Sequence, residues 1–101
     1  MSCGDYHLFF GLLSNELKIG IIEKLLFAPL SVSVLANEIM EERSKVSHAL
    51  LALKKCNIVK AEKAGKERIY SVNNKTIKPI FELVDRHVKE NCIYCRAKKR
   101  S

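Results

Sequence analysis

The sequence predicts a mainly α domain with one small β-hairpin, and three observations lead to this prediction. Apolar residues recur at helical spacing from residue 5 to residue 55. Two strand-length segments rich in β-formers then flank a glycine. A last segment again shows apolar residues at alternating intervals of three and four. With 101 residues there is no room for a second core, so we expect 1–101 to form a single domain.

Three helices are expected before residue 40. Asp5 is placed to cap the first, Ser14-Asn15 the second and Ser31 the third, because short polar side chains accept hydrogen bonds from first-turn amides. Pro29 ends the second helix. In the third helix the residues expected to face inward are Val34, Leu35 and Ile39. The apolar residues at helical spacing in the first two helices are Leu8, Phe9, Leu12, Leu13, Leu17, Ile21, Ile22, Leu25 and Leu26.

A polar turn containing Glu41-Glu42 leads into a fourth helix at about 43–55. Its Val46, Leu50 and Leu53 share one apolar stripe, since they lie at i, i+4 and i+7. A short helix, a tight polar turn and a helix with one apolar stripe are typical of a helix-turn-helix.

The predicted hairpin pairs residues 58–63 with 67–72 around Ala64-Gly65-Lys66, where Gly65 can adopt the positive φ of a tight loop. Thr76 or Asn74 then caps a last helix, 76–91. The narrow apolar seam of that helix, typical of packing on a partner helix, consists of Ile77, Ile80, Phe81, Val84 and Val88. The predicted order, α-α-α-α-β-β-α, is that of a winged helix-turn-helix.

The charge is unevenly distributed along the chain. Residues 1–42 carry two Lys against six acidic residues (net −4), whereas residues 43–101 carry sixteen Lys or Arg against five (net +11), which together give +7. A cationic excess confined to one part of the chain is the pattern of a phosphate-binding surface. The alternative is a basic domain that stays in solution through self-repulsion.

From about Leu8 to Val72 the chain resembles the ArsR superfamily of bacterial and archaeal winged-helix repressors. The segments that carry the resemblance are Leu30-Ser31-Val32-Ser33-Val34-Leu35-Ala36, Arg43-Ser44-Lys45-Val46-Ser47-His48-Ala49-Leu50, Lys54-Lys55-Cys56-Asn57-Ile58-Val59 and Gly65-Lys66-Glu67-Arg68-Ile69-Tyr70-Ser71-Val72. Two departures stand out. Glu41-Glu42 occupy a turn where family members often have glycine, and Ser31 and Ser33 replace a metal-binding Cys-x-Cys.

The resemblance implies a homodimeric, cytoplasmic transcription regulator in a prokaryotic or archaeal cell. Its first and last helices would form the dimer contact, through Leu8, Phe9 and Leu12 together with the seam of the last helix. The partner would be double-stranded DNA. One alternative is a winged-helix module whose groove binds a protein or structured RNA. Another is a metal- or thiol-responsive variant of the regulator that uses Cys92 and Cys95.

On the DNA, the fourth helix is expected to enter the major groove by its N-terminus, with Arg43 or Lys45 at a guanine. Ser44 would cap this helix or bind a phosphate, and the hairpin, or wing, 60–68, would follow the backbone or minor groove. The predicted DNA-binding residues are Arg43, Ser44, Lys45, Ser47, His48, Lys54, Lys63, Lys66 and Arg68. The alternative for these side chains is a solvated basic surface.

Four cysteines occur, and a C-x2-C pair, Cys92 and Cys95, precedes a basic tail within residues 92–101. This spacing suits two thiolates on one zinc ion, with Cys3 as a further ligand. A disulfide or a free pair are the alternatives. Cys56 is expected to pack as a small buried thiol.

Other functions are not supported by the sequence. No apolar run approaches the ~20 residues that cross a bilayer, and no secretory signal is recognisable. No cysteine or histidine forms a recognisable nucleophile–base–carboxylate set, so an enzyme is not expected.

Overall fold

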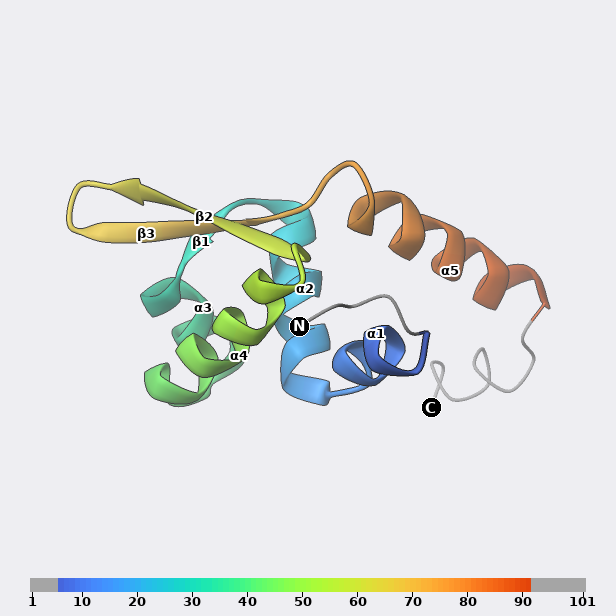
Figure 1. Ribbon diagram of the computed structural model, residues 1–101, viewed down its shortest axis with the longest axis horizontal. Helices are drawn as coiled ribbons and strands as arrows, with labels where there is room; N and C mark the ends of the chain where they lie inside the picture. Colours follow the sequence, from blue (N-terminus) through green and yellow to red (C-terminus); the bar gives the residue numbers. More distant parts are fainter. Residues whose placement is uncertain (1–5, 92–101) are drawn as a thin grey trace.

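The computed structural model describes residues 6–91, and it confirms a mainly α fold with a small antiparallel sheet (Figure 1). The elements are α1 Tyr6–Leu13, α2 Glu16–Phe27, β1 Leu30–Ser31, α3 Val32–Ile39, α4 Arg43–Lys55, β2 Val59–Ala64, β3 Glu67–Val72 and α5 Ile77–Asn91. The order matches the predicted one except for β1, a two-residue strand that the sequence analysis missed.

Two of the predicted helix caps are confirmed. The Asn15 side chain accepts a hydrogen bond from the Lys18 amide at 3.0 Å, and the Ser31 hydroxyl accepts one from the Val34 amide at 3.3 Å. Asp5 lies outside the described residues. At the last helix the prediction was wrong, because neither the Asn74 nor the Thr76 side chain accepts a hydrogen bond within residues 6–91. The Asn73 side chain accepts one from the Lys75 amide, in the turn before α5.

The turn between α3 and α4 contains a left-handed residue, but it is not at the glutamates. Met40 has φ 63° and ψ 48° and ends α3, with its amide donating to the Ala36 carbonyl. Glu42 is the residue before α4, and its side chain makes no capping hydrogen bond. Ser44, which was expected to cap this helix or bind a phosphate, lies inside α4 and does not cap it.

β3 is the central strand of the sheet, with β1 on one side and β2 on the other. In the wing, which consists of β2, the turn and β3, Lys63 pairs with Arg68 and Ala61 with Tyr70. Gly65 has φ 66° in the turn, as predicted. β1 pairs Leu30 with Tyr70, so Tyr70 is flanked on both sides.

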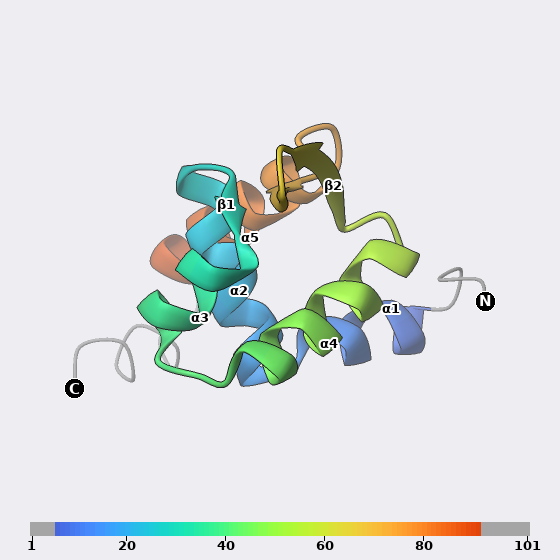
Figure 2. The same cartoon turned by 90° about the vertical axis from the view of Figure 1, so that its left-hand side faces the viewer.

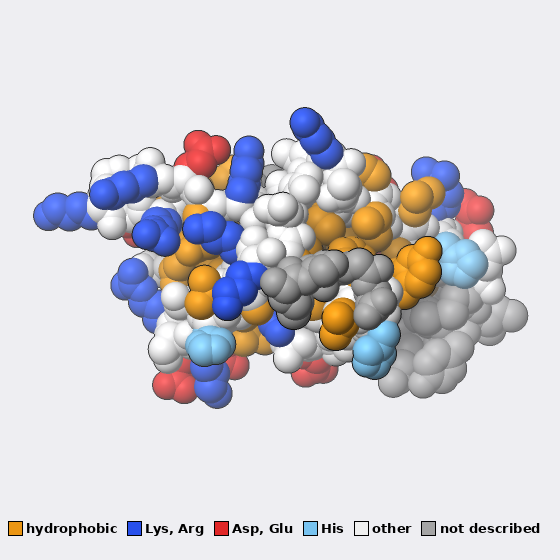
Figure 3. Space-filling view, viewed as in Figure 1, with side chains coloured by type: hydrophobic (Ala, Val, Ile, Leu, Met, Phe, Trp, Pro, Cys, Tyr) orange, Lys and Arg blue, Asp and Glu red, His pale blue; other side chains and the backbone are white. Residues whose placement is uncertain are grey.

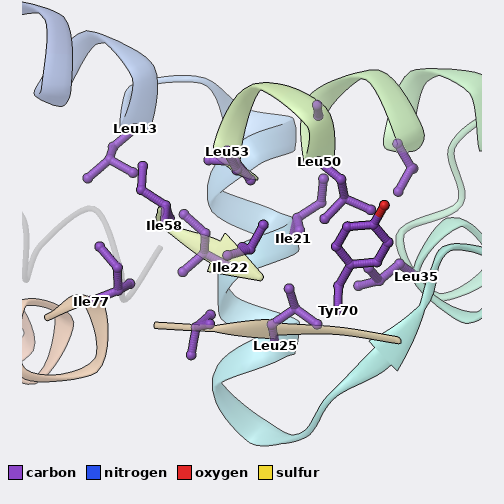
Figure 4. Packing of buried hydrophobic residues seen from close by; sticks show 14 of the residues in the cluster. Leu13, Ile21, Ile22, Leu25, Leu35, Leu50, Leu53, Ile58, Tyr70 and Ile77 are labelled. Carbon is purple, nitrogen blue, oxygen red and sulfur yellow. The ribbon is translucent and has the colours of Figure 1, made fainter. Parts of the chain in front are cut away.

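The core lies where α2, α3 and α4 pack against the sheet (Figure 4). The predicted stripe of α4 is confirmed, since Val46, Leu50 and Leu53 are each 0% exposed. The prediction that Val34 faces inward was wrong. This residue is 40% exposed, and Leu35 and Ala36 are the buried residues of α3.

α5 leaves the body of the protein at the end opposite the wing (Figure 1). Ile77 is its only buried residue within 77–91, and Ile80 and Phe81 pack partly on the core. The rest of the helix extends past α1, which lies at the same end of the molecule. No helix of the described part is long and apolar enough to span a membrane.

Candidate nucleic-acid interface

The nine predicted DNA-binding residues are all solvent-exposed, and they lie on α4 and on the wing. Arg43, Ser44, Lys45, Ser47, His48 and Lys54 belong to α4, Lys63 to β2, Lys66 to the wing turn, and Arg68 to β3. Figure 2 shows α4 from the side on which the wing projects toward the viewer, and Figure 3 shows Lys and Arg side chains gathered over the wing and α4.

The cations of α4 do not share one face. Successive residues turn by roughly 100° about a helix axis, which places Arg43, Ser47 and Lys54 within about 40° of one another. Lys45 is on the opposite flank, with the buried stripe between the two flanks. Ser44 and His48 face outward, away from the core.

Lys45 is also engaged with acidic neighbours. Its Nζ lies 3.7 Å from Glu41 Oε1 and 3.8 Å from Glu42 Oε1. Arg43 has no carboxylate within ion-pair distance among residues 6–91. Of the two residues predicted to address a guanine, Arg43 is therefore the one whose charge is not already balanced locally.

The wing presents cations that the fold does not require. Lys63 and Arg68 are directly opposite each other across the hairpin, and like charges in that position destabilise a sheet. Neither is in an ion pair with any residue that the structure describes, whereas Lys60 pairs with Glu62 at 3.8 Å. The described residues therefore offer no acidic partner to offset these two opposed cations.

An open pocket of about 330 Å³ separates α4 from the wing. Arg43 and Ser47 line it from α4, and Arg68 and Tyr70 from β3. The remaining lining residues are Ser31, Val32, Lys66 and Glu67. Arg68 and Tyr70 share a face because side chains alternate along a strand, so the guanidinium is on the side of the sheet that packs on the helices.

Sequence reasoning did not select four of the pocket residues as functional, and Ser31 and Tyr70 are the two of these that are buried. Ser31 was read as a cap and Tyr70 as a β-former, and both readings are correct. Tyr70 could have been recognised from its position two residues after Arg68, because this spacing places both side chains on one face of the strand.

The predicted dimer residues differ in accessibility. Ile77 is 2% exposed and lies in the core, so it offers no surface to a partner. Leu8 and Val84 are 43% and 50% exposed. The other predicted dimer residues are half-buried, namely Phe9, Leu12, Ile80, Phe81 and Val88.

The metal prediction falls on Cys92, Cys95 and Cys3, which lie outside the described residues. No group of three or more His, Cys, Asp or Glu side chains within 6–91 is arranged to hold a metal ion. Cys56 is half-buried against the core and disulfide-bonded, so its predicted role as a simple buried thiol was wrong.

No family model and no curated protein matches the chain. Solved structures do match. Rv0081 of Mycobacterium tuberculosis is 27% identical with a TM-score of 0.75, covering 80% of this chain and 82% of its own. Reduced HlyU of Vibrio cholerae is 26% identical with a TM-score of 0.70, covering 77% and 82%.

A third match is the homodimeric winged helix-turn-helix DNA-binding domain Mb0332 of Mycobacterium bovis, a possible ArsR-family transcriptional regulator. It is 20% identical, covers 89% of this chain and 92% of its own, and has a TM-score of 0.75. The chain therefore has the winged helix-turn-helix fold. The expected resemblance to ArsR-like regulators is confirmed in its structure.

Proposed function

We propose that the protein is a transcriptional regulator that binds specific sequences of double-stranded DNA as a homodimer. The observation that carries the proposal is the cationic surface formed by one flank of α4 and the wing, whose Arg43, Lys63 and Arg68 lack acidic partners among residues 6–91. Mb0332, which shares the fold, is a homodimeric DNA-binding domain.

In this function α4 lies in the major groove and the wing follows the backbone or the minor groove. Arg43, at the first position of α4, can bind the O6 and N7 acceptors of a guanine with its planar guanidinium. Ser44 and His48, on the outward face of α4, lie beside it. Lys63, Lys66 and Arg68 supply charge for phosphates.

The homodimer is supported by the apolar seam of α5. Val84 and the adjacent Leu83 are 50% and 57% exposed, on a helix whose later turns are not covered by the rest of the described chain. A second copy would remove this surface from water. Two copies joined at this end would direct two wings outward, toward half-sites about one helical turn, ~34 Å, apart.

The test is to select bound sequences from random duplex DNA and to measure affinity by fluorescence anisotropy at several salt concentrations. With ~6–8 phosphates contacted per dimer, log affinity should fall against log salt with a slope of roughly −5 to −7. Arg43→Ala should weaken binding at least tenfold, since the dimer loses two bidentate arginine–guanine pairs, each worth about 1–3 kcal/mol.

The matched control is Lys24→Ala. Lys24 lies on α2 and pairs with Glu38 at 3.5 Å, so its removal should leave DNA affinity unchanged. If no duplex is selected, or if Arg43→Ala binds as the wild type does, the proposal is wrong. Binding of structured RNA or of a protein by the same surface would then be the function that remains.

A further inference from the structure

We infer that the pocket between α4 and the wing is a binding site for a single phosphate group, with the Tyr70 hydroxyl as a neutral donor at its base. The inference rests on the proposed function for the source of that group, a phosphate of the DNA backbone. Its chemistry, a tetrahedral oxyanion, does not depend on that source, because free phosphate carries the same acceptor oxygens.

The first observation is a buried hydroxyl without a partner. Tyr70 is 7% exposed, and its hydroxyl makes no hydrogen bond within residues 6–91. Figure 4 shows its ring rising from β3 toward α4, with the oxygen at the far end. Buried polar groups are almost always hydrogen-bonded, so a tyrosine hydroxyl that reaches a pocket unpaired indicates a missing acceptor.

The second observation is a further donor at the same pocket. Ser31 is 5% exposed, and its oxygen accepts the hydrogen bond from the Val34 amide that caps α3. A hydroxyl that accepts one hydrogen bond still has its own hydrogen to donate. Ser47, on the α4 side of the pocket, offers a third hydroxyl.

The third observation is the charge at the rim. Arg43, Lys66 and Arg68 line the pocket together with one acid, Glu67, a net of two positive charges. None of the three cations is in an ion pair with any part of the chain that the structure describes. Cations at the rim of the pocket and neutral hydroxyl donors at its base form a site for an anion with several acceptor oxygens.

The position of the pocket indicates which phosphate it takes. A helix in the major groove and a hairpin in the adjacent minor groove are separated by one strand of sugar-phosphate backbone. The pocket lies between α4 and the wing, where that strand would run. One phosphate per half-site would enter it, while the other contacts remain at the exposed lysines.

Three variants distinguish this pocket from a general basic surface. Tyr70→Phe removes one hydroxyl, keeps the ring, and should weaken DNA binding roughly tenfold because a donor to a charged oxygen is lost. Its salt slope should not change, since no charge is removed. Arg68→Gln should weaken binding and reduce the slope by about one per protomer. Glu67→Gln should tighten binding, because it removes the repelling carboxylate.

The matched control for these variants is Lys60→Gln. Lys60 is a wing cation outside the pocket and is already paired with Glu62. Circular dichroism and thermal unfolding of each variant separate a lost contact from a lost fold.

The decisive measurement replaces single phosphates of the selected duplex by neutral methylphosphonates. In the wild type, replacement at one position per half-site should reduce DNA affinity far more than replacement at its neighbours. In Tyr70→Phe the loss of affinity at that position alone should be smaller. If the losses of binding free energy from Tyr70→Phe and from each methylphosphonate are additive at every position, DNA binds without using the pocket. The pocket inference is then wrong, while the regulator proposal stands.

A second arm uses inorganic phosphate without DNA and follows backbone amides by NMR. Phosphate should shift the amides of Ser31, Ser47 and Tyr70 in the wild type but not in Arg68→Gln. If these shifts occur and no duplex binds, the pocket is a phosphate site and the regulator proposal fails. If neither phosphate nor DNA acts through these residues, the pocket inference is overturned.

Discussion

Lys45 Nζ lies 3.7 Å from Glu41 Oε1 in an i, i+4 pair that joins the turn to the first turn of α4. Arg43, two residues earlier and on the other flank of the helix, has no such partner among residues 6–91. α4 therefore begins with one cation that lines the pocket beside the wing and one that is paired with the chain's own acids. The two differ in what they can offer DNA.

This asymmetry predicts unequal effects of two similar substitutions. Arg43→Ala should weaken DNA binding at least tenfold, and Lys45→Ala by only about two- to threefold, because phosphate attraction to Lys45 is offset by Glu41 and Glu42. Glu41→Gln should tighten binding slightly by releasing Lys45. Fluorescence anisotropy on one duplex checks all three. Equal losses for the two cations would show that the ion pairs do not matter.

Met40 provides a stability prediction at the turn. It is 89% exposed with φ 63°, a conformation that costs a non-glycine residue roughly 1–2 kcal/mol. Met40→Gly should therefore stabilise the protein by about 0.5–1 kcal/mol after the larger backbone entropy of glycine is included. Met40→Ala keeps the Cβ and is the matched control, expected to change little. Urea unfolding gives the free energy of unfolding of both variants. Destabilisation by Met40→Gly would contradict the left-handed conformation of Met40.

Two adjacent leucines of α4 provide a core prediction. Leu50 is 0% exposed and Leu51 is 51% exposed. Leu50→Ala should lower the free energy of unfolding by about 2–5 kcal/mol, the usual cost of a buried leucine and the cavity it leaves. Leu51→Ala should cost well under 1 kcal/mol. Similar thermal or urea midpoints for the two variants would show that the stripe is wrongly placed.

The seam of α5 predicts the oligomeric state. Val84→Glu should shift the protein from dimer to monomer in analytical ultracentrifugation, because it places a charge on the exposed apolar surface. The salt slope of DNA binding should then fall by about half, since each protomer carries half the phosphate contacts. Arg86→Glu introduces the same side chain on the opposite face of the helix and should leave the dimer intact. A wild-type monomer at micromolar concentration would contradict the proposed assembly.

Much of the fold could be predicted because the deciding signals are local. The Asn15 and Ser31 caps, the stripe of Val46, Leu50 and Leu53, and Gly65 in the wing each depend on neighbours within a few residues. β1 was missed since two residues give no alternation to detect, and since Ser31 is at once strand and cap.

The site was predicted less completely, for a related reason. The exposed cations of α4 and the wing follow from helical and strand periodicity. The pocket does not, because Ser31, Arg43 and Tyr70 meet only through the pairing of β1 with β3 and the packing of α4 beneath them. Ile77 was assigned to a partner surface because the apolar seam of α5 alone does not show that its first turn belongs to the core.

Because α5 is attached to the core only by its first turns, the stability of the protein should depend on its concentration. When a second copy covers the later turns of α5, association and folding are linked by mass action. The melting temperature should then rise with protein concentration, and dilution alone should lower it.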